Sequence, residues 1–195
     1  MTKEKLRKSF LNRRTLLTEK EYEYLNSQLL AQVIRFNFCD YNYLHCFLPI
    51  IKNKEPNTFS IIDFLRTTYP NLYIVISRTN FSTLSLKHYI FNKKTILSNN
   101  NFGIPEPIDG EICSSDYIDI ILIPLLTFDQ HGHRIGYGKG IYDRFLTECR
   151  PNAVKVGLSL FEGIEHIDET NSFDQRLDYC ITPTQIVQFS ITSSK

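Results

Sequence analysis

The sequence has no excess of charge of either sign, no cysteine pair at redox or metal-site spacing, and no apolar run of membrane length. Its 22 basic and 21 acidic side chains nearly cancel, so the chain lacks the global field that attracts nucleic acid or anionic membranes. The five cysteines are odd in number and form no CxxC pair, as expected of reduced thiols in a cytoplasmic protein. We therefore expect a small-molecule partner and no nucleic-acid or membrane partner. We also expect a monomer, although no sequence feature determines the oligomeric state.

Several other signals are also missing. The longest apolar stretch, residues 118–126, contains Asp119 and is too short to cross a bilayer. The basic N-terminal segment lacks an uninterrupted apolar core, which argues against a secretory signal. No GxSxG elbow and no cysteine nucleophile motif occur, so covalent hydrolase chemistry lacks support. His131 and His133 have no third ligand at metal-site spacing, and we interpret them as part of a surface turn. The adjacent basic residues Arg13 and Arg14 are interpreted as a solvated face.

Hydrophobic periodicity predicts a layered α/β fold with a mostly parallel sheet flanked by helices. Residues 3–36 have the spacing of two helices, separated by a capping box formed by Thr18 and Glu21. We expect one domain over residues 1–195, with these helices at 1–36 and an α/β body at 43–189. Residues 92–116 are rich in turn-forming residues and are expected to form a long ordered loop. The expected strands are 43–48, 72–77, 84–90 near a sheet edge, 118–124, 153–159 and 179–182, and the other expected helices are 58–68 and 141–149.

The segment RIGYGKGIYD, residues 134–143, has the composition of a phosphate-binding loop. Its three glycines let the backbone approach an anion closely, and amides at the start of a following helix donate to phosphate oxygens. Arg134 and Lys139 add positive charge. Asp143 is suited to bind the Mg²⁺ that accompanies a nucleotide.

The spacing of this loop fits neither common nucleotide fingerprint. A Walker loop aligned on Gly138 and Lys139 would need Ser or Thr at position 140, where the chain has Gly140. A dinucleotide fingerprint starting at Gly136 would need glycine in place of Ile141. From spacing alone, a glycine-rich turn that only joins a strand to a helix therefore stays open as an alternative.

Five motifs together resemble the 5-formyltetrahydrofolate cyclo-ligase family, whose members are also called 5,10-methenyltetrahydrofolate synthetases. LIPLLTFDQHGHRIGYGKGIYDRFL at 122–146 is similar to the longest signature of the family, and it is accompanied in family order by KEKLRKSFLNRR at 3–14, EPNT at 55–58, GIPEP at 103–107 and DQRLDYCIT at 174–182. The resemblance implies the cyclo-ligase fold, which is related to the NagB/RpiA/CoA-transferase-like fold.

The resemblance also implies a reaction and roles for residues. ATP would phosphorylate the formyl oxygen of 5-formyltetrahydrofolate, N10 would attack the activated carbon, and ring closure would release phosphate beside ADP. ATP and Mg²⁺ are thus the implied co-substrate and metal, with Arg134 and Lys139 at the reacting phosphoryl group. The resemblance assigns ATP binding to Lys3, Arg7, Arg134, Gly136, Tyr137, Gly138, Lys139, Gly140 and Tyr142; folate binding to Leu48, Glu55, Tyr137 and Ile141; and metal binding to Asp143 and Asp174.

Some alternatives and departures remain. Phe47 and Leu48 fit core packing as well as a pterin slot, and Glu106 fits either an adenine contact or a role in shaping its loop. Ile141 stands where the family commonly has a tyrosine, and residues 50–54 form a longer connection than usual. A non-catalytic folate- or nucleotide-binding protein, or a kinase for another small molecule, would keep the same glycine loop.

Overall fold

The fold is built on one large sheet, which the computed structural model describes within residues 1–190; the last five residues of the expected domain lie outside the described part. The sheet has eight strands in the order β12-β11-β10-β7-β1-β2-β3-β6. Their bounds, in chain order, are β1 Tyr43–His45, β2 Tyr73–Asn80, β3 Ser85–Ile90, β6 Ile112–Cys113, β7 Ile120–Pro124, β10 Val154–Leu158, β11 Tyr179–Ile181 and β12 Ile186–Gln188.

The centre of this sheet is parallel and its edges are antiparallel. β11, β10, β7, β1 and β2 pair in parallel, whereas β12, β3 and β6 pair antiparallel with their neighbours. The expected α/β class with a mostly parallel sheet is confirmed.

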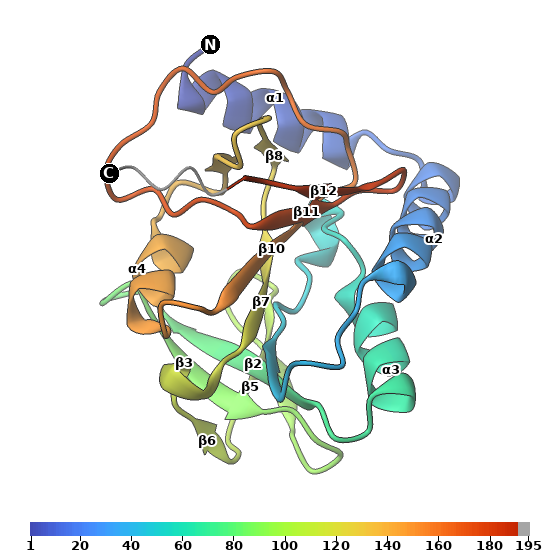
Figure 1. Ribbon diagram of the computed structural model, residues 1–195, viewed down its shortest axis with the longest axis vertical. Helices are drawn as coiled ribbons and strands as arrows, with labels where there is room; N and C mark the ends of the chain where they lie inside the picture. The colour runs from blue at the N-terminus through green and yellow to red at the C-terminus, as the bar shows by residue number, and fades with distance from the viewer. Residues whose placement is uncertain (191–195) are drawn as a thin grey trace.

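Helices cover both faces of the sheet (Figure 1). α2 (Glu19–Arg35) and α3 (Thr58–Thr68) pack on one face and α4 (Ile141–Glu148) on the other, while α1 (Lys3–Thr15) lies across the end of the sheet. β7 shows why this arrangement forms: Ile120 and Leu122 belong to the cluster under α2 and α3, whereas Ile121 and Ile123 belong to the cluster under α4. Its near-continuous apolar run is buried on both faces, as is usual for a central parallel strand.

Local sequence signals set the helix starts. Thr18 and Glu21 form the expected capping box at the start of α2, and the Asn57 side chain accepts the Phe59 N–H at the start of α3. Gly140, with φ of 66°, precedes α4 in a left-handed conformation that costs glycine little. No helix within residues 1–190 is both long and apolar enough to cross a membrane.

Several expected elements were wrong in extent. The expected strand at 43–48 is limited to β1, and Leu84, expected at the start of a strand, has φ of 56° in the turn before β3. β3 lies near the sheet edge as expected, next to the edge strand β6. The expected loop at 92–116 contains the hairpin β4 (Leu97–Asn99) and β5 (Pro105–Pro107), together with β6 and the short helix η2 (Ser115–Tyr117).

Four more elements were not expected at all. These are strands β8 (Thr127–Phe128) and β9 (Arg134–Ile135), which form a hairpin, the helix η1 (Ile51–Asn53), and strand β12. Each is only two or three residues long, so hydrophobic alternation is too short to be recognised in any of them.

Candidate active site

A cavity of about 450 Å³ opens where β1, β2 and β7 approach the glycine loop. Ligand sites of open α/β sheets lie beyond the carboxyl ends of parallel strands, and His45 of β1 and Pro124 of β7 hold that position here. All the site residues expected from the sequence line this cavity: Lys3, Arg7, Leu48, Glu55, Arg134, Gly136, Tyr137, Gly138, Lys139, Gly140, Ile141, Tyr142, Asp143 and Asp174. Segments far apart in the chain therefore meet at one cavity. The individual roles of these residues stay predictions.

The glycine loop joins β9 to α4 and is fixed to α1. Gly138 has φ of 87°, and a Cβ there would lie 3.0 Å from the Arg7 guanidinium. Arg7 Nε donates to Gly136 O at 3.2 Å. Glycine at 138 thus permits both the left-handed turn and the close approach of an arginine from α1.

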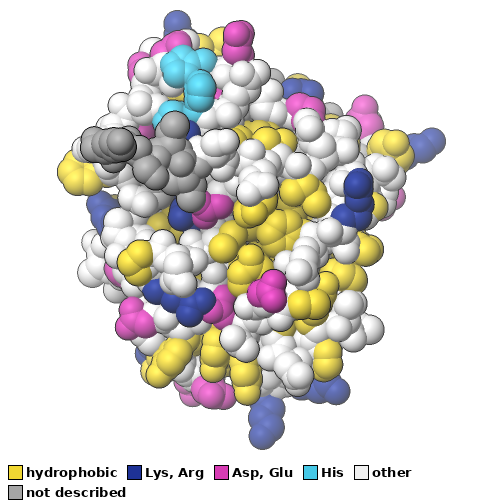
Figure 2. Space-filling view, viewed as in Figure 1, with side chains coloured by type: hydrophobic (Ala, Val, Ile, Leu, Met, Phe, Trp, Pro, Cys, Tyr) yellow, Lys and Arg dark blue, Asp and Glu magenta, His cyan; other side chains and the backbone are white. Residues whose placement is uncertain are grey.

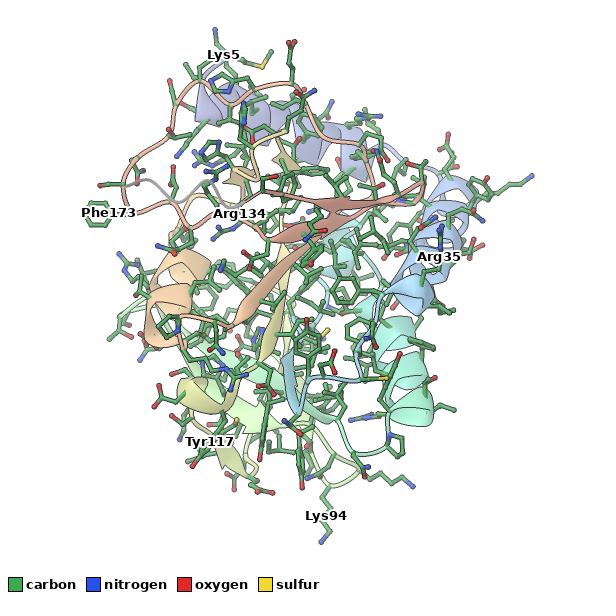
Figure 3. The ribbon with its side chains drawn as sticks, viewed as in Figure 1. Lys5, Arg35, Lys94, Tyr117, Arg134 and Phe173 are labelled. Carbon is green, nitrogen blue, oxygen red and sulfur yellow. The ribbon has the colours of Figure 1, made fainter. Side chains whose placement is uncertain are left out.

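Arg134 and Lys3 bring positive charge to this side of the cavity, and each forms an ion pair with an aspartate. Arg134 Nη2 donates to Asp143 Oδ1 at 2.7 Å, and Lys3 Nζ donates to Asp174 Oδ2 at 2.5 Å. The Arg134 side chain is only 6% exposed, and it lies inside the molecule between α1 and α4, whereas Lys5 of α1 points outward (Figure 3). Burial lowers the pKa of Arg134 and the neighbouring Asp143 acts in the opposite direction.

The two aspartates fit a nucleotide-bound magnesium ion. Within residues 1–190, no group of three or more His, Cys, Asp or Glu side chains is arranged to hold a metal, but Mg²⁺ with a nucleotide needs only one or two carboxylates beside phosphate oxygens. In the same range, Asp143 Oδ2 and Asp174 Oδ1 accept no hydrogen bond. Burial alone would raise the pKa of Asp174, but hydrogen bonds from Lys3 and Asn171 outweigh burial and lower it.

Glu55 is a buried carboxylate that also lines the cavity. Its Oε1 accepts the Tyr137 hydroxyl at 2.6 Å, and its Oε2 accepts the Ile50 N–H at 2.7 Å. Burial raises the pKa of Glu55, while the charge of Arg14 and the hydrogen bonds from Ile50 and Tyr137 act against that rise. Glu55 is therefore held in one orientation by the glycine loop itself, through Tyr137.

Arg14 is a residue that sequence reasoning missed. The interpretation that it shares a solvated basic face with Arg13 is wrong: Arg14 is buried, with side-chain exposure of 4%, and forms an ion pair of 3.9 Å with Glu55. Nothing in the local pattern distinguishes the two arginines. Their helical positions and the packing of α1 against the sheet decide which one is buried.

Other residues that line the cavity include aromatic rings and neutral polar side chains. Lys139 Nζ lies 5.3 Å from the ring centroids of both Phe81 and Phe102. Among the polar side chains, His45 Nε2 and Ser77 Oγ are 2.8 Å apart. Burial, and then the neighbouring His88, lowers the pKa of His45. These two side chains are thus uncharged, in contrast to the charged loop side.

Three alternatives that the sequence left open can be placed. Leu48 both packs in the core and lines the cavity, so the two interpretations are compatible. The Glu106 carboxylate accepts the Thr79 N–H at 2.9 Å and ties the β4–β5 hairpin to β2, which favours a role in shaping the loop.

His131 and His133 lie in the β8–β9 turn, where the Asp129 carboxylate accepts hydrogen bonds from both residues. Figure 2 shows histidine side chains gathered in one surface patch on the viewed face, and no metal-ligand group occurs there among the described residues.

Comparison with known proteins decides the family. Residues 1–183 match the model described as the 5-formyltetrahydrofolate cyclo-ligase family. The chain belongs to that family. Among relatives, the 5-formyltetrahydrofolate cyclo-ligase of Mycoplasma genitalium is 30% identical over 182 residues, which cover 92% of this chain and 96% of the relative. The probable cyclo-ligase of Schizosaccharomyces pombe is 29% identical over 158 residues, or 73% and 76% of the two chains.

Two solved structures share the cyclo-ligase fold. The 5,10-methenyltetrahydrofolate synthetase of Aquifex aeolicus aligns with a TM-score of 0.78 at 24% identity, covering 100% of this chain and 96% of that one. The corresponding enzyme of Mycoplasma pneumoniae aligns with a TM-score of 0.74 at 22% identity, covering 94% and 99%. At these identities the likeness establishes the fold alone.

Proposed function

We propose that the protein converts 5-formyltetrahydrofolate to 5,10-methenyltetrahydrofolate with ATP and Mg²⁺, releasing ADP and phosphate. The observation that carries the proposal is the meeting of five sequence segments at one cavity, which is lined by cations and by a buried carboxylate. Membership of the cyclo-ligase family supports the same reaction.

The loop side suits the triphosphate of ATP. Arg7, Arg134 and Lys139 bring positive charge around the loop, and the N-terminus of α4 directs backbone amides to the same region. Phosphoryl transfer depends mainly on positioning and on charge stabilisation. When bound, Mg²⁺ would be held by Asp143 and Asp174 and would offset part of the triphosphate charge.

The Glu55 side suits the folate. An ionised carboxylate accepts hydrogen bonds from the N–H groups of a pterin ring, and Leu48 and Ile141 supply apolar walls for a planar ring. In the proposed sequence, the formyl oxygen attacks the γ-phosphorus of ATP and ADP leaves. N10 then attacks the activated formyl carbon, and the C–O bond breaks as phosphate departs and the ring closes.

The direct test mixes the purified protein with ATP, Mg²⁺ and 5-formyltetrahydrofolate and records the absorbance of the methenyl product together with ADP. We expect both products to appear in equal amounts. Well-folded protein that gives no chromophore rejects the proposal. Ligand binding without ADP would instead indicate a non-catalytic binding protein, and ADP release independent of the folate would indicate a kinase for another substrate.

Lys139→Ala tests the loop. Because it removes a charge from the phosphoryl region without touching the core, we expect kcat to fall on the order of 100-fold or more with unchanged thermal stability. Lys94→Ala is the matched control, since Lys94 stands out from the other end of the molecule (Figure 3). A wild-type rate in the Lys139 variant would remove that residue from the mechanism.

We also propose that the protein acts as a monomer in the cytoplasm. All five cysteines are free thiols in the structure, which is consistent with a reducing compartment. Sedimentation of the purified protein tests the monomer, and imaging of a tagged chain in its own cell tests the location.

A further inference from the structure

Arg14 is not among the residues that line the cavity, but it contacts two side chains that are, Tyr137 and Glu55. Its guanidinium directs Nε to Asn53 O at 2.7 Å and Nη1 to Leu125 O at 3.1 Å. Nη2 donates to the Tyr137 hydroxyl and lies 3.9 Å from Glu55 Oε1. A planar guanidinium with several fixed donors holds its partners in one geometry, which a flexible lysine would not do.

The two partners of Nη2 come from different segments of the chain. Tyr137 lies in the glycine loop between two glycines, and Glu55 lies after η1 at the folate side of the site. The Tyr137 hydroxyl donates to Glu55 while it accepts from Arg14, and Asn53 Nδ2 approaches it at 3.4 Å. The three side chains therefore form one connected buried network between loop and carboxylate.

The charge balance of this network depends on Arg14. A buried carboxylate is costly unless it is paired and hydrogen-bonded, and removal of one partner of a buried pair leaves the other charge uncompensated. Besides Arg14, the titratable groups that face Glu55 are the phenols of Tyr22, Tyr137 and Tyr142, which are neutral because burial raises the pKa of each. Arg14 thus supplies the positive charge beside Glu55.

We propose that Arg14 is a positioning residue that fixes the Glu55 carboxylate and the Tyr137 hydroxyl as one unit, and so couples nucleotide binding at the glycine loop to folate binding. The inference rests on the proposed function, because it takes ATP and the folate as the two ligands. A nucleotide bound at the loop lies next to Tyr137, so it acts through this network on the Glu55 carboxylate that the folate contacts. By linkage, the folate must strengthen nucleotide binding by the same factor.

The experiment measures the Kd of 5-formyltetrahydrofolate by titration calorimetry, with and without a saturating non-hydrolysable ATP analogue and Mg²⁺. In the wild-type protein we expect the analogue to lower this Kd by about fivefold or more, the lower end of typical couplings. The coupling ratio is the Kd of the folate without the analogue divided by its Kd with the analogue. In Arg14→Met and in Tyr137→Phe we expect this coupling ratio to fall to within about twofold of one, because each variant breaks the network.

Arg13→Met is the matched control. Arg13 is the adjacent residue of α1, is exposed, and stacks on the Phe161 ring at 4.0 Å, so its loss removes the same charge outside the network. It should keep the wild-type ratio. If Arg14→Met does not fold, Tyr137→Phe tests the coupling instead. It deletes a single hydroxyl oxygen of the network and should leave the fold intact.

A pH series supplies a readout that a merely structural role would not change. The folate needs ionised Glu55, so its affinity is lost as the pH falls through the Glu55 pKa. Without Arg14 that pKa rises, and the loss should occur at a higher pH in Arg14→Met than in the wild type. Arg14→Lys keeps the charge and should keep the wild-type pH profile while losing most of the coupling.

The outcomes separate the two proposals. A wild-type protein that turns over substrate but shows a ratio near one, or a Tyr137→Phe variant with full coupling, overturns the role of Arg14 and leaves the reaction intact. An unshifted pH profile in folded Arg14→Met overturns it as well. A wild-type protein that binds neither ligand rejects the proposed function first.

Discussion

Replacing Asp143 by asparagine should strengthen the binding of ATP in the absence of metal, although it removes an expected metal ligand. In the structure, Asp143 Oδ1 accepts a hydrogen bond of 2.7 Å from Arg134 Nη2. The aspartate therefore competes with the triphosphate for this arginine and also repels it. An asparagine at this position would keep the size and an acceptor oxygen but would carry no charge.

The magnitude follows from this one contact. A hydrogen bond between charged groups contributes about 1.5–3 kcal/mol. The Asp143 side chain is 31% exposed, so solvent screening favours the lower end of this range. A gain of about 1.4 kcal/mol corresponds to a tenfold change in Kd. We expect metal-free ATP to bind about tenfold more tightly to Asp143→Asn than to the wild type, and Mg²⁺-ATP to bind more weakly.

Titration calorimetry with ATP, in EDTA and in excess Mg²⁺, measures both expected changes in Kd with one protein preparation. Asp63→Asn serves as the control, because Asp63 is exposed on α3 and its loss changes the net charge by the same amount. Circular dichroism checks that the variant is folded, because buried Arg134 loses a charged partner and keeps only neutral ones, such as Gln175 O. Unchanged or weaker metal-free binding in folded Asp143→Asn would refute the competition between carboxylate and triphosphate for Arg134.

Three other substitutions probe separate parts of the molecule. Gly138→Ala should raise the KM for ATP, because it adds about 1–2 kcal/mol of left-handed strain and crowds Arg7 at 3.0 Å; an unchanged KM would contradict this. Ile141→Tyr should lower the folate KM by about twofold to tenfold through added aromatic contact, and an equal or higher KM would show that residue 141 does not reach the ligand. Gly157→Ala should destabilise the protein by about 1–3 kcal/mol in urea unfolding, since its Cβ would lie 2.6 Å from a Leu125 methyl group; an unshifted midpoint would contradict the overpacking.

The parts of the fold that could be predicted are those with long or distinctive local signals. The apolar run that became β7 must be buried on both faces, and this alone indicates a central parallel strand. The capping box before α2 similarly fixed a helix start. By contrast, β6, β8 and β9 are two residues long, and their pairing depends on partners that local sequence does not reveal.

The candidate site divides in the same way. The glycine loop could be located because three closely spaced glycines and flanking charges point to an anion without knowledge of the fold. Glu55 has no such local signal, and its assignment came from resemblance alone. Its burial and its bond to Tyr137 arise from contacts across 82 residues of sequence.

Arg14 shows why a positioning residue is harder to find than a ligand contact. Arg13 and Arg14 are identical in type and adjacent, so charge and composition cannot separate them. A step of one residue rotates a side chain by about 100° around a helix, which places Arg13 against Phe161 at the surface and Arg14 in the interior beside Glu55. The burial of a charge then requires partners, and each side-chain nitrogen of Arg14 donates to one. Because those partners come from η1, the end of β7 and the glycine loop, the function of this residue is a property of the assembled fold rather than of any motif.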